Sequence, residues 1–308
     1  MYKPPLVIYH KQLGDVLLLE PALAKLASWA GGSVTLATRP GFSPMIQLMD
    51  SVEPIPNGIF RQASQVVSFD PRSRGCLLSL TTWAREKRLI VSQKKHLKAW
   101  HALFFPTQRR VASDSRYYRA EYFFDVMPCE SKMAFRPPKL SRPPGDWHPQ
   151  SLPENYVLLH LTSAWQRKSW LAERWVATIN ELSRQGWGPF VITGGGAEWE
   201  KQYIQTIVNS VDVEIIDING RTSLSQYLSV IANAKVLLCI DGSSSHIASA
   251  FGIPCVTLFG PSNPLHWHCP TQGAIAIDAR KYSSEPKPST SFISVDSVVS
   301  ASLLLMNN

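Results

Sequence analysis

Short apolar runs alternate with helix-like segments along the whole chain, and this alternation constrains the possible folds more than any other feature. In the first half, strand-like runs occupy residues 6–9, 33–37, 66–69 and 88–91. Helical patterns lie between and after them, including residues 16–27 and 117–126. Such alternation is typical of βα units arranged around a parallel sheet. We therefore expect an α/β fold.

A proline-rich stretch at residues 136–145 interrupts the pattern and indicates an interdomain linker, because proline removes backbone donors and breaks both periodicities. The pattern then restarts with strand-like runs at 156–160, 189–193, 213–216, 236–240, 255–259 and 274–277. A helix begins near Ala172, and a closing helix covers 295–306. We expect two Rossmann-like domains, residues 1–145 and 146–308, with a ligand at the carboxyl ends of their strands, in the cleft between them.

Composition excludes several classes of protein. A chain of 308 residues that is 44% hydrophobic is long and apolar enough to bury a large core, which argues against intrinsic disorder. The nearest cysteines, Cys255 and Cys269, are 14 residues apart, so no pair has the short spacing of a zinc site. No run approaches the roughly 20 apolar residues of a membrane span, and the start lacks a signal-peptide core. We expect a cytoplasmic protein with reduced thiols.

Positive charge is concentrated in one half of the chain. Residues 1–150 hold 21 Lys and Arg against 11 Asp and Glu, a net charge of +10, whereas residues 151–308 hold 10 against 12, a net charge of −2. The density is highest between Arg85 and Arg119. The plain interpretation is a solvated face. The alternative is a surface that meets a polyanion, either nucleic acid or anionic lipid with phosphorylated headgroups.

Four polar motifs follow predicted strands. The first is Gly14-Asp15, where Gly14 permits a close approach of the backbone and Asp15 is either a functional carboxylate or the N-cap of the next helix. The second comprises Thr162, Ser163 and Lys168, which supply the hydroxyls and the point charge that a diphosphate needs. An ordinary polar loop is the alternative to a diphosphate site.

The third motif runs from Gly194 and Gly195 to Glu198 and Glu200. Glycines allow the backbone to approach a flat base, and a carboxylate one turn later can accept hydrogen bonds from ribose hydroxyls. Acidic residues that simply favour the start of a helix are the alternative.

The fourth motif places a hydroxyl-rich turn between a strand and a helix. The amide groups of the helix start, reinforced by serines, predict an anion site that needs no metal. For the histidine, burial with a backbone carbonyl partner is as good an explanation as ligand contact. The motif consists of Asp241, Gly242, Ser243, Ser244, Ser245 and His246.

The order of these motifs resembles glycosyltransferase family nine, the family of lipopolysaccharide core heptosyltransferases. The motifs are L-G-D-V…P-A-L, K-S-W…E-R-W, T-G-G-G…E, N-G-R-T-S-L, D-G-S-S-S-H and L-F-G-P-S-N-P. The resemblance implies a GT-B fold, that is, two Rossmann-like domains whose parallel sheets face an interdomain cleft. It further implies an ADP-heptose donor on the second domain and an anionic sugar-lipid acceptor on the first.

The resemblance also implies roles for single residues. Asp15 matches the catalytic base and Lys168 the diphosphate-binding lysine, whereas Glu200, with Glu198 as a near substitute, matches a ribose-binding carboxylate. An unperturbed aspartate has a pKa of about 3.9, so the base requires a poorly solvated cleft. Charge density alone suggests three acceptor contacts, Arg61, Arg116 and Arg119. The order Asp241-Gly242-Ser243 departs from the usual Asp-Ser/Thr-Gly of the family and removes one hydroxyl from the expected phosphate contacts.

The leading hypothesis is an inverting, metal-independent glycosyltransferase without a cofactor that works on an anionic glycolipid at the cytoplasmic face of the inner membrane. No Asp-x-Asp motif for a bridging metal occurs in the chain. One alternative is a sugar-nucleotide epimerase or hydrolase of the same fold. The other is a non-catalytic polyanion-binding protein, although the chain shows neither the aromatic and basic interleaving of RNA surfaces nor a helix-turn-helix or zinc module, so we expect no nucleic acid partner.

Overall fold

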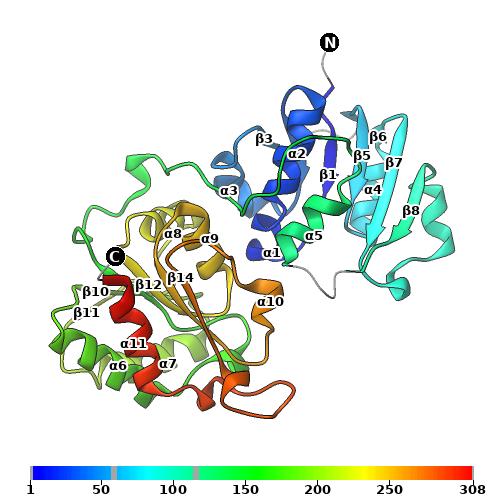
Figure 1. Cartoon of the computed structure of the whole chain (residues 1–308). Coiled ribbons are helices and arrows are strands. Elements are labelled where there is room, and N and C mark those ends of the chain that lie inside the picture. The colour runs from blue at the N-terminus through cyan, green and yellow to red at the C-terminus, as the bar shows by residue number, and fades with distance from the viewer. Residues whose placement is uncertain (1–2, 57–60, 114–117, 307–308) are drawn as a thin grey trace. The chain divides into compact units, whose positions relative to one another are not determined.

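A computed structural model describes residues 3–56, 61–113 and 118–306 and divides the chain into two compact units, Met1–Ser141 and Arg142–Asn308 (Figure 1). The boundary expected between residues 145 and 146 falls four residues later than this division. Each unit contains a six-stranded sheet in which all paired neighbours are parallel. The expected α/β class is therefore confirmed.

The sheet of the first unit has the strand order β3-β2-β1-β5-β7-β8. From β1 the chain moves outward through β2 and β3, and from β5 it moves outward in the other direction through β7 and β8. In such a sheet the ligand crevice lies where the direction reverses, at the carboxyl ends of β1 and β5. The strands are β1 (Leu6–Ile8), β2 (Val34–Ala37), β3 (Val52–Pro54), β5 (Gln65–Ser68), β7 (Glu86–Val91) and β8 (Gln108–Val111), with β4 (Arg61–Gln62) and β6 (Thr82–Trp83) forming a separate two-stranded sheet.

The helix expected at residues 16–27 is two helices. It is interrupted at Leu18 and Leu19, and the second helix places Pro21 in its first turn. Proline lacks an amide hydrogen and fits the first turn of a helix but not its interior, so the helix restarts there. The helices of this unit are α1 (Leu13–Leu17), α2 (Glu20–Ala30), α3 (Ser43–Gln47), α4 (Ser73–Leu80) and α5 (Arg119–Val126), with 3-10 turns η1 (Pro40–Phe42), η2 (Lys94–His96) and η3 (Ala99–Leu103).

The sheet of the second unit has the order β11-β10-β9-β12-β13-β14, so its reversal point lies at the carboxyl ends of β9 and β12. The expected strands at 236–240 and 255–259 are confirmed residue for residue. The strands are β9 (Val157–His160), β10 (Phe190–Thr193), β11 (Ile215–Asp217), β12 (Val236–Ile240), β13 (Cys255–Phe259) and β14 (Ala274–Asp278).

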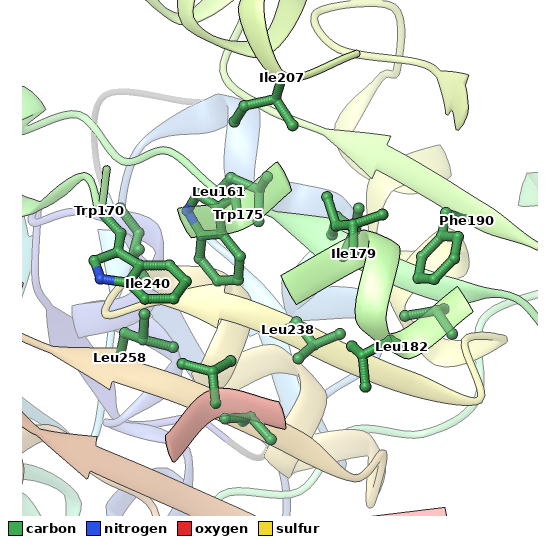
Figure 2. Close-up of a cluster of buried hydrophobic side chains, with 14 of the residues drawn as sticks. Leu161, Trp170, Trp175, Ile179, Leu182, Phe190, Ile207, Leu238, Ile240 and Leu258 are labelled. Atoms are coloured by element: carbon green, nitrogen blue, oxygen red, sulfur yellow. The ribbon is translucent and has the colours of Figure 1, made fainter. Parts of the chain in front are cut away.

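Large apolar side chains lock the helices of the second unit onto this sheet (Figure 2). Trp170 and Trp175 meet edge to face at 4.8 Å, and the Trp170 indole donates to the Ile293 carbonyl at 3.2 Å. The closing helix has its expected bounds and packs on α6 and β13 of the same unit. The helices are α6 (Ala172–Arg184), α7 (Glu198–Val208), α8 (Leu224–Ala232), α9 (Ser243–Phe251), α10 (Pro264–Trp267) and α11 (Val295–Met306), with 3-10 turns η4 (Gly145–Trp147), η5 (Gln166–Lys168), η6 (Ala279–Lys281) and η7 (Thr290–Phe292).

None of the helices in the described ranges combines the length and the apolarity that a bilayer span requires.

Candidate active site

A buried ion pair marks the reversal point of the second sheet. Lys168, in η5 after β9, places its Nζ 2.5 Å from Oδ2 of Asp241, which follows β12 directly. The two side chains are only 15% and 6% exposed, although the residues are 73 positions apart in sequence. A pair so shielded from water is rigid, and the loss of one partner alone costs about 3–5 kcal/mol. The structure thus brings together two of the residues expected to bind donor.

Helix α9 begins beside this pair and points its first amide groups away from the helix body. Its N-cap, Gly242, is extended and provides no side-chain cap. Ser245 donates its hydroxyl hydrogen to the Gly242 carbonyl at 2.9 Å, so this serine shapes the turn. Uncapped amide groups and the helix dipole together favour an anion at this position. Ser243 and Ser244 occupy the first two positions of the helix.

One buried polar atom at the start of α9, Nδ1 of His246, has no hydrogen-bond partner among the described residues. The neighbouring Ser244 faces the side chains of Tyr227 and Cys239. The backbone carbonyl partner considered for His246 is therefore not found at Nδ1. Burial lowers the pKa of His246 to about 4, with Asp241 opposing and Lys168 and His268 adding to the shift, so the imidazole is neutral at pH 7. A neutral ring supplies hydrogen bonds but no charge.

Glycines at the ends of β10 and β11 let two loops touch. Gly196 and Gly220 have φ angles of +78° and +66°, and a Cβ on either residue would lie 2.8 Å from the Cα of the other. Gly194 is equally confined, since a Cβ there would lie 2.3 Å from Oδ1 of Asn219 and 3.1 Å from the hydroxyl of Thr162. These contacts explain why the sequence uses glycine here.

The buried carboxylate of Glu200 holds the glycine loop in place through hydrogen bonds. It is 4% exposed, and its carboxylate accepts hydrogen bonds from the amide groups of Gly195 at 3.3 Å and Ala197 at 3.1 Å. Glu198 is exposed and accepts from Gln202 at 3.3 Å. The alternative explanation, an acidic residue that stabilises a helix start, thus describes the contact of Glu200 with the Ala197 amide, whereas Glu198 contacts a side chain one turn later in the helix. Ribose contact stays a prediction for both glutamates.

Two buried polar side chains lie beside the same loop. The hydroxyl oxygen of Thr162 and Oδ1 of Asn219 are both buried, and neither has a hydrogen-bond partner within the described ranges. Buried polar atoms are rarely left unpaired, so these two oxygens are candidates for contact with a polar ligand. Asn219 was not singled out from the sequence as a site residue, although it opens the N-G-R-T-S-L motif. Ser163 lies nearby, with its hydroxyl accepting from the Trp165 amide at 3.2 Å and its Cβ 4.0 Å from the position of a Cβ on Gly242.

In the first unit, Asp15 follows β1 at the reversal point of that sheet. Helix α1 begins at Leu13 with Gln12 as its N-cap, so the interpretation of Asp15 as the N-cap is wrong, and Asp15 lies within the first turn. Gly14 is buried in the same turn. Burial raises the pKa of the Tyr9 phenol, the carboxylate of Asp15 raises it further, and the guanidinium of Arg119 lowers it. The charges of Asp15 and Arg119 therefore both shift the pKa of the Tyr9 hydroxyl.

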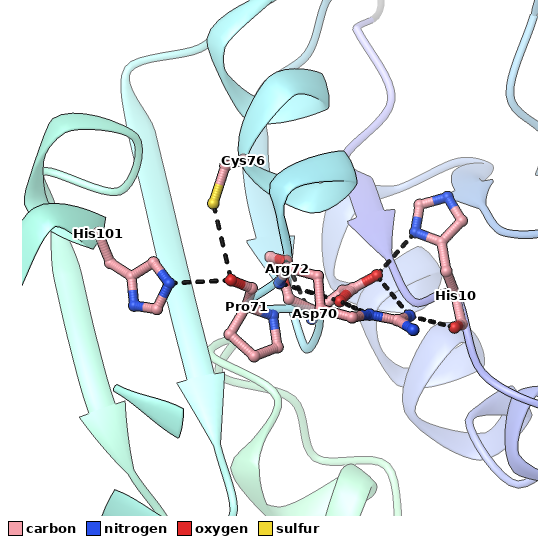
Figure 3. Close-up of polar contacts among 7 residues, drawn as sticks. His10, Asp70, Pro71, Arg72, Cys76 and His101 are labelled. Atoms are coloured by element: carbon pink, nitrogen blue, oxygen red, sulfur yellow. Dashed lines mark hydrogen bonds and ion pairs between the residues drawn. The ribbon is translucent and has the colours of Figure 1, made fainter. Parts of the chain in front are cut away.

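A second ionic cluster at this edge was missed in the sequence (Figure 3). Asp70, after β5, is 1% exposed and lies 3.0 Å from Nδ1 of His10 and 2.7 and 2.9 Å from two nitrogens of Arg72. Burial favours a raised pKa for Asp70, but the hydrogen bonds from His10 and Arg72 hold that pKa well below its ordinary value. The ionised Asp70 thus fixes the Arg72 guanidinium, whose side chain is 55% exposed. A fixed, accessible guanidinium is suited to carboxylate or phosphate recognition.

The three expected acceptor contacts have different outcomes. Arg119 starts α5, and its charge, like that of Asp15, shifts the pKa of Tyr9. Arg61 lies in β4, which pairs with β6 and comes before the amino-terminal end of β5, whereas α1 follows the carboxyl end of β1. This placement does not support a contact with an acceptor at Asp15. Arg116 lies outside the described residues.

Side chains that bind metals do not cluster in the described ranges. No group of three or more His, Cys, Asp or Glu residues there is arranged to hold an ion.

Comparisons with known proteins place this chain beside enzymes of one class. The family described as "Glycosyltransferase family 9 (heptosyltransferase)" matches residues 59–292, which is more than half of the chain. Lipopolysaccharide heptosyltransferase 1 of Pseudomonas aeruginosa is 30% identical over 108 residues, covering 35% of this chain and 29% of that protein. The matched segments span less than half the length of the curated relatives.

Solved structures show the same fold over the whole chain. E. coli ADP-heptose lipopolysaccharide heptosyltransferase II superimposes with a TM-score of 0.80 at 15% identity, covering 99% of this chain and 98% of that one. E. coli heptosyltransferase WaaC with ADP-2-deoxy-2-fluoro heptose gives a TM-score of 0.73 at 16% identity and covers 99% and 100% of the two chains. The GT-B architecture of two Rossmann-like domains is therefore confirmed.

Proposed function

Because the chain belongs to glycosyltransferase family 9, we propose that it transfers heptose from ADP-heptose to an anionic acceptor of the lipopolysaccharide core or a related glycan. The observation that carries this proposal is the anion site at the ends of β9 and β12. There the Lys168 ammonium lies beside the uncapped start of α9, and the buried hydroxyl oxygen of Thr162, after β9, has no partner in the described chain. The relative of known structure that binds an ADP-heptose analogue supports the choice of donor.

The donor nucleotide occupies the second unit in this proposal. The diphosphate lies at the first amide groups of α9 and at Lys168, which Asp241 holds in place. The adenosine lies at the loop of Gly194 and Gly195, which packs against the buried oxygens of Thr162 and Asn219. Lysine and helix dipole together supply the positive charge that the leaving diphosphate requires, so the proposed reaction needs no bridging metal.

The chemistry is a single displacement with inversion. Asp15 takes the proton of the acceptor hydroxyl while that oxygen forms a bond to the anomeric carbon. The bond from this carbon to the diphosphate oxygen breaks, and ADP leaves with the electron pair. A positioned base contributes typically about 10²–10⁴-fold to the rate, and stabilisation of the departing charge supplies the rest.

The acceptor is proposed to bind at the carboxyl edge of the first sheet. Arg72, fixed by Asp70, and Arg119, whose charge acts on Tyr9 as that of Asp15 does, are two cations of the first unit that suit an acidic or phosphorylated sugar. An anionic glycolipid acceptor requires the protein to work as a peripheral protein at the cytoplasmic face of the inner membrane. No step of this reaction involves nucleic acid.

Ligand-dependent stability tests the donor assignment. A ligand present at about 100 times its Kd stabilises the folded state by about 2.7 kcal/mol. We expect ADP-heptose and ADP to raise the unfolding temperature, and UDP- and GDP-sugars to have little effect. Equal stabilisation by all three bases, or by none, would refute the donor assignment.

Donor turnover without acceptor distinguishes the alternative chemistry. We expect ADP release from ADP-heptose to be slow until a lipopolysaccharide-core acceptor is added. Rapid donor consumption in the absence of acceptor would instead identify a hydrolase or epimerase of the same fold.

A further inference from the structure

The first unit exposes large apolar side chains that its core does not use. They lie on α4, on β6 and on the η3 segment between β7 and β8, and their exposed fractions are 60% for Leu77, 60% for Leu80, 61% for Trp83, 48% for Trp100 and 78% for Leu103. A single exposed leucine needs no explanation, but several in one region indicate an interaction site.

Hydrogen bonds place these side chains in one region. The Ser79 hydroxyl on α4 donates to the Phe104 carbonyl at 2.7 Å, and Nε2 of His101 lies 2.9 Å from the Pro71 carbonyl. These two contacts hold η3 along the length of α4. The Thr82 hydroxyl donates to the Leu78 carbonyl at 2.7 Å and so ties β6 to the end of the same helix.

The cations of this region fall into two groups. Some serve the fold itself: Lys87 donates to the Ser79 carbonyl at 2.6 Å, Arg109 to the Phe105 carbonyl at 2.7 Å, and Arg88 pairs with Glu86 at 2.6 Å. The others are exposed and take part in no ion pair of the described chain, and they are Arg74, Arg85, Lys94, Lys95 and Lys98. The sequence from residue 92 to 113 contains no acidic residue. The five exposed apolar side chains and these five cations together are named the basic apolar face.

We propose that the basic apolar face docks on an anionic lipid bilayer, an inference that rests on the membrane-bound acceptor of the proposed function. Trp and Leu side chains enter the boundary between headgroups and acyl chains, while lysines remain among the phosphates. Nucleic acid fits this face less well, because single strands bind through stacked aromatic side chains and leucines offer no ring for stacking.

Aromatic and cationic side chains also gather at the amino-terminal edge of the first unit's sheet. A shallow, open pocket of about 560 Å³ there is lined by Trp83 and Trp29 together with Lys3 and Arg85, and no acidic residue lines it. The Lys3 ammonium lies 4.9 Å from the centre of the Trp83 ring. An aromatic and cationic recess beside the docking face is suited to an anionic headgroup.

Vesicle sedimentation of the full chain tests this proposal without requiring transfer activity. We expect binding to vesicles of phosphatidylcholine and phosphatidylglycerol in equal parts, a sharp decrease with added salt, and weak binding to phosphatidylcholine alone. The variant Lys94→Gln/Lys95→Gln/Lys98→Gln should bind the anionic vesicles on the order of 100-fold more weakly. The variant Trp100→Ser/Leu103→Ser should lose on the order of 10-fold.

A matched control changes three exposed lysines of the second unit, Lys201→Gln/Lys281→Gln/Lys287→Gln, which removes the same charge and should leave vesicle binding unchanged. All variants should keep the thermal stabilisation by ADP, which shows that they fold and bind nucleotide. Failure of ADP stabilisation in the unaltered protein would count against the proposed function, whereas intact ADP stabilisation without vesicle binding would overturn only the docking face. Equal losses of vesicle binding in the control and in the lysine variant would also overturn the docking face. So would single-stranded DNA that binds more tightly than the anionic vesicles and whose binding is unchanged by Trp100→Ser/Leu103→Ser.

Discussion

The contact between Gly196 and Gly220 allows a sharp test of how the donor loops are built. Alanine at position 196 adds a Cβ at a φ of +78°, only 2.8 Å from the Cα of Gly220. The obstacle is backbone rather than the end of a flexible side chain, so a loop must shift. Gly252 offers a matched control in the same unit, since its φ is +74° and nothing lies within 4 Å of the added Cβ.

The two substitutions separate backbone conformation from steric overlap. The left-handed conformation costs an alanine about 1 kcal/mol, and this is the whole expected effect of Gly252→Ala. Gly196→Ala has the same conformational cost and in addition the cost of forcing two packed backbones apart, about 1–3 kcal/mol. We therefore expect Gly196→Ala to lower the free energy of unfolding by about 2–4 kcal/mol and to weaken ADP binding, while Gly252→Ala leaves ADP binding unchanged.

Urea unfolding followed by tryptophan fluorescence measures this difference, because Trp170, Trp175 and Trp187 are buried in the second unit. ADP binding is measured by calorimetry on the same samples. If Gly196→Ala and Gly252→Ala destabilise the protein equally and both bind ADP normally, the two loops do not touch as described.

Three further predictions concern charged groups. Lys168→Met should abolish donor binding and lower the free energy of unfolding by about 3–5 kcal/mol, because Asp241 stays buried without its partner. The double variant Lys168→Met/Asp241→Asn should regain most of this stability in urea unfolding but should regain no turnover. Arg72→Gln should raise the KM for acceptor about tenfold and leave the Kd for ADP unchanged, and Arg72→Lys should have an intermediate KM. An unchanged KM would show that Arg72 does not bind the acceptor. Burial holds the pKa of His160 and of His246 at about 4, below the ordinary 6.5, so between pH 4 and pH 6.5 the unfolded chain binds more protons than the folded chain. The free energy of unfolding should therefore fall as the pH drops from 6.5 to about 4. His160→Asn or His246→Asn should flatten this slope in urea titrations at each pH.

Strong local patterns made the frame of the fold predictable. The apolar runs of β12 and β13 and the closing helix α11 have the bounds that the sequence indicates, because each strand is a short, almost wholly apolar run and the helix repeats apolar side chains from Val295 to Met306. The pair β4 and β6 was not predicted, since strands of two residues carry no periodicity. Strand β8 was missed because its sequence, Gln-Arg-Arg-Val, contains little apolar character.

The site was predictable in its residue types but not in its contacts. Lys168 and Asp241 were both expected at the donor, yet only the register of β9 beside β12 shows that they pair with each other. Asp70 and Arg72 were not recognised, because Ser-Phe-Asp-Pro-Arg in the sequence is equally typical of an ordinary turn. Contacts between distant segments depend on strand order, and a single sequence does not reveal that order.

The central claim is that the carboxylate after β1 activates the acceptor while the second unit holds the donor. Its most direct test is the rate of heptose transfer by Asp15→Asn, with the Kd for ADP-heptose measured on the same preparation. The account predicts an unchanged Kd and a transfer rate lower by about 10²–10⁴-fold. Transfer near the unaltered rate would show that Asp15 is not the base.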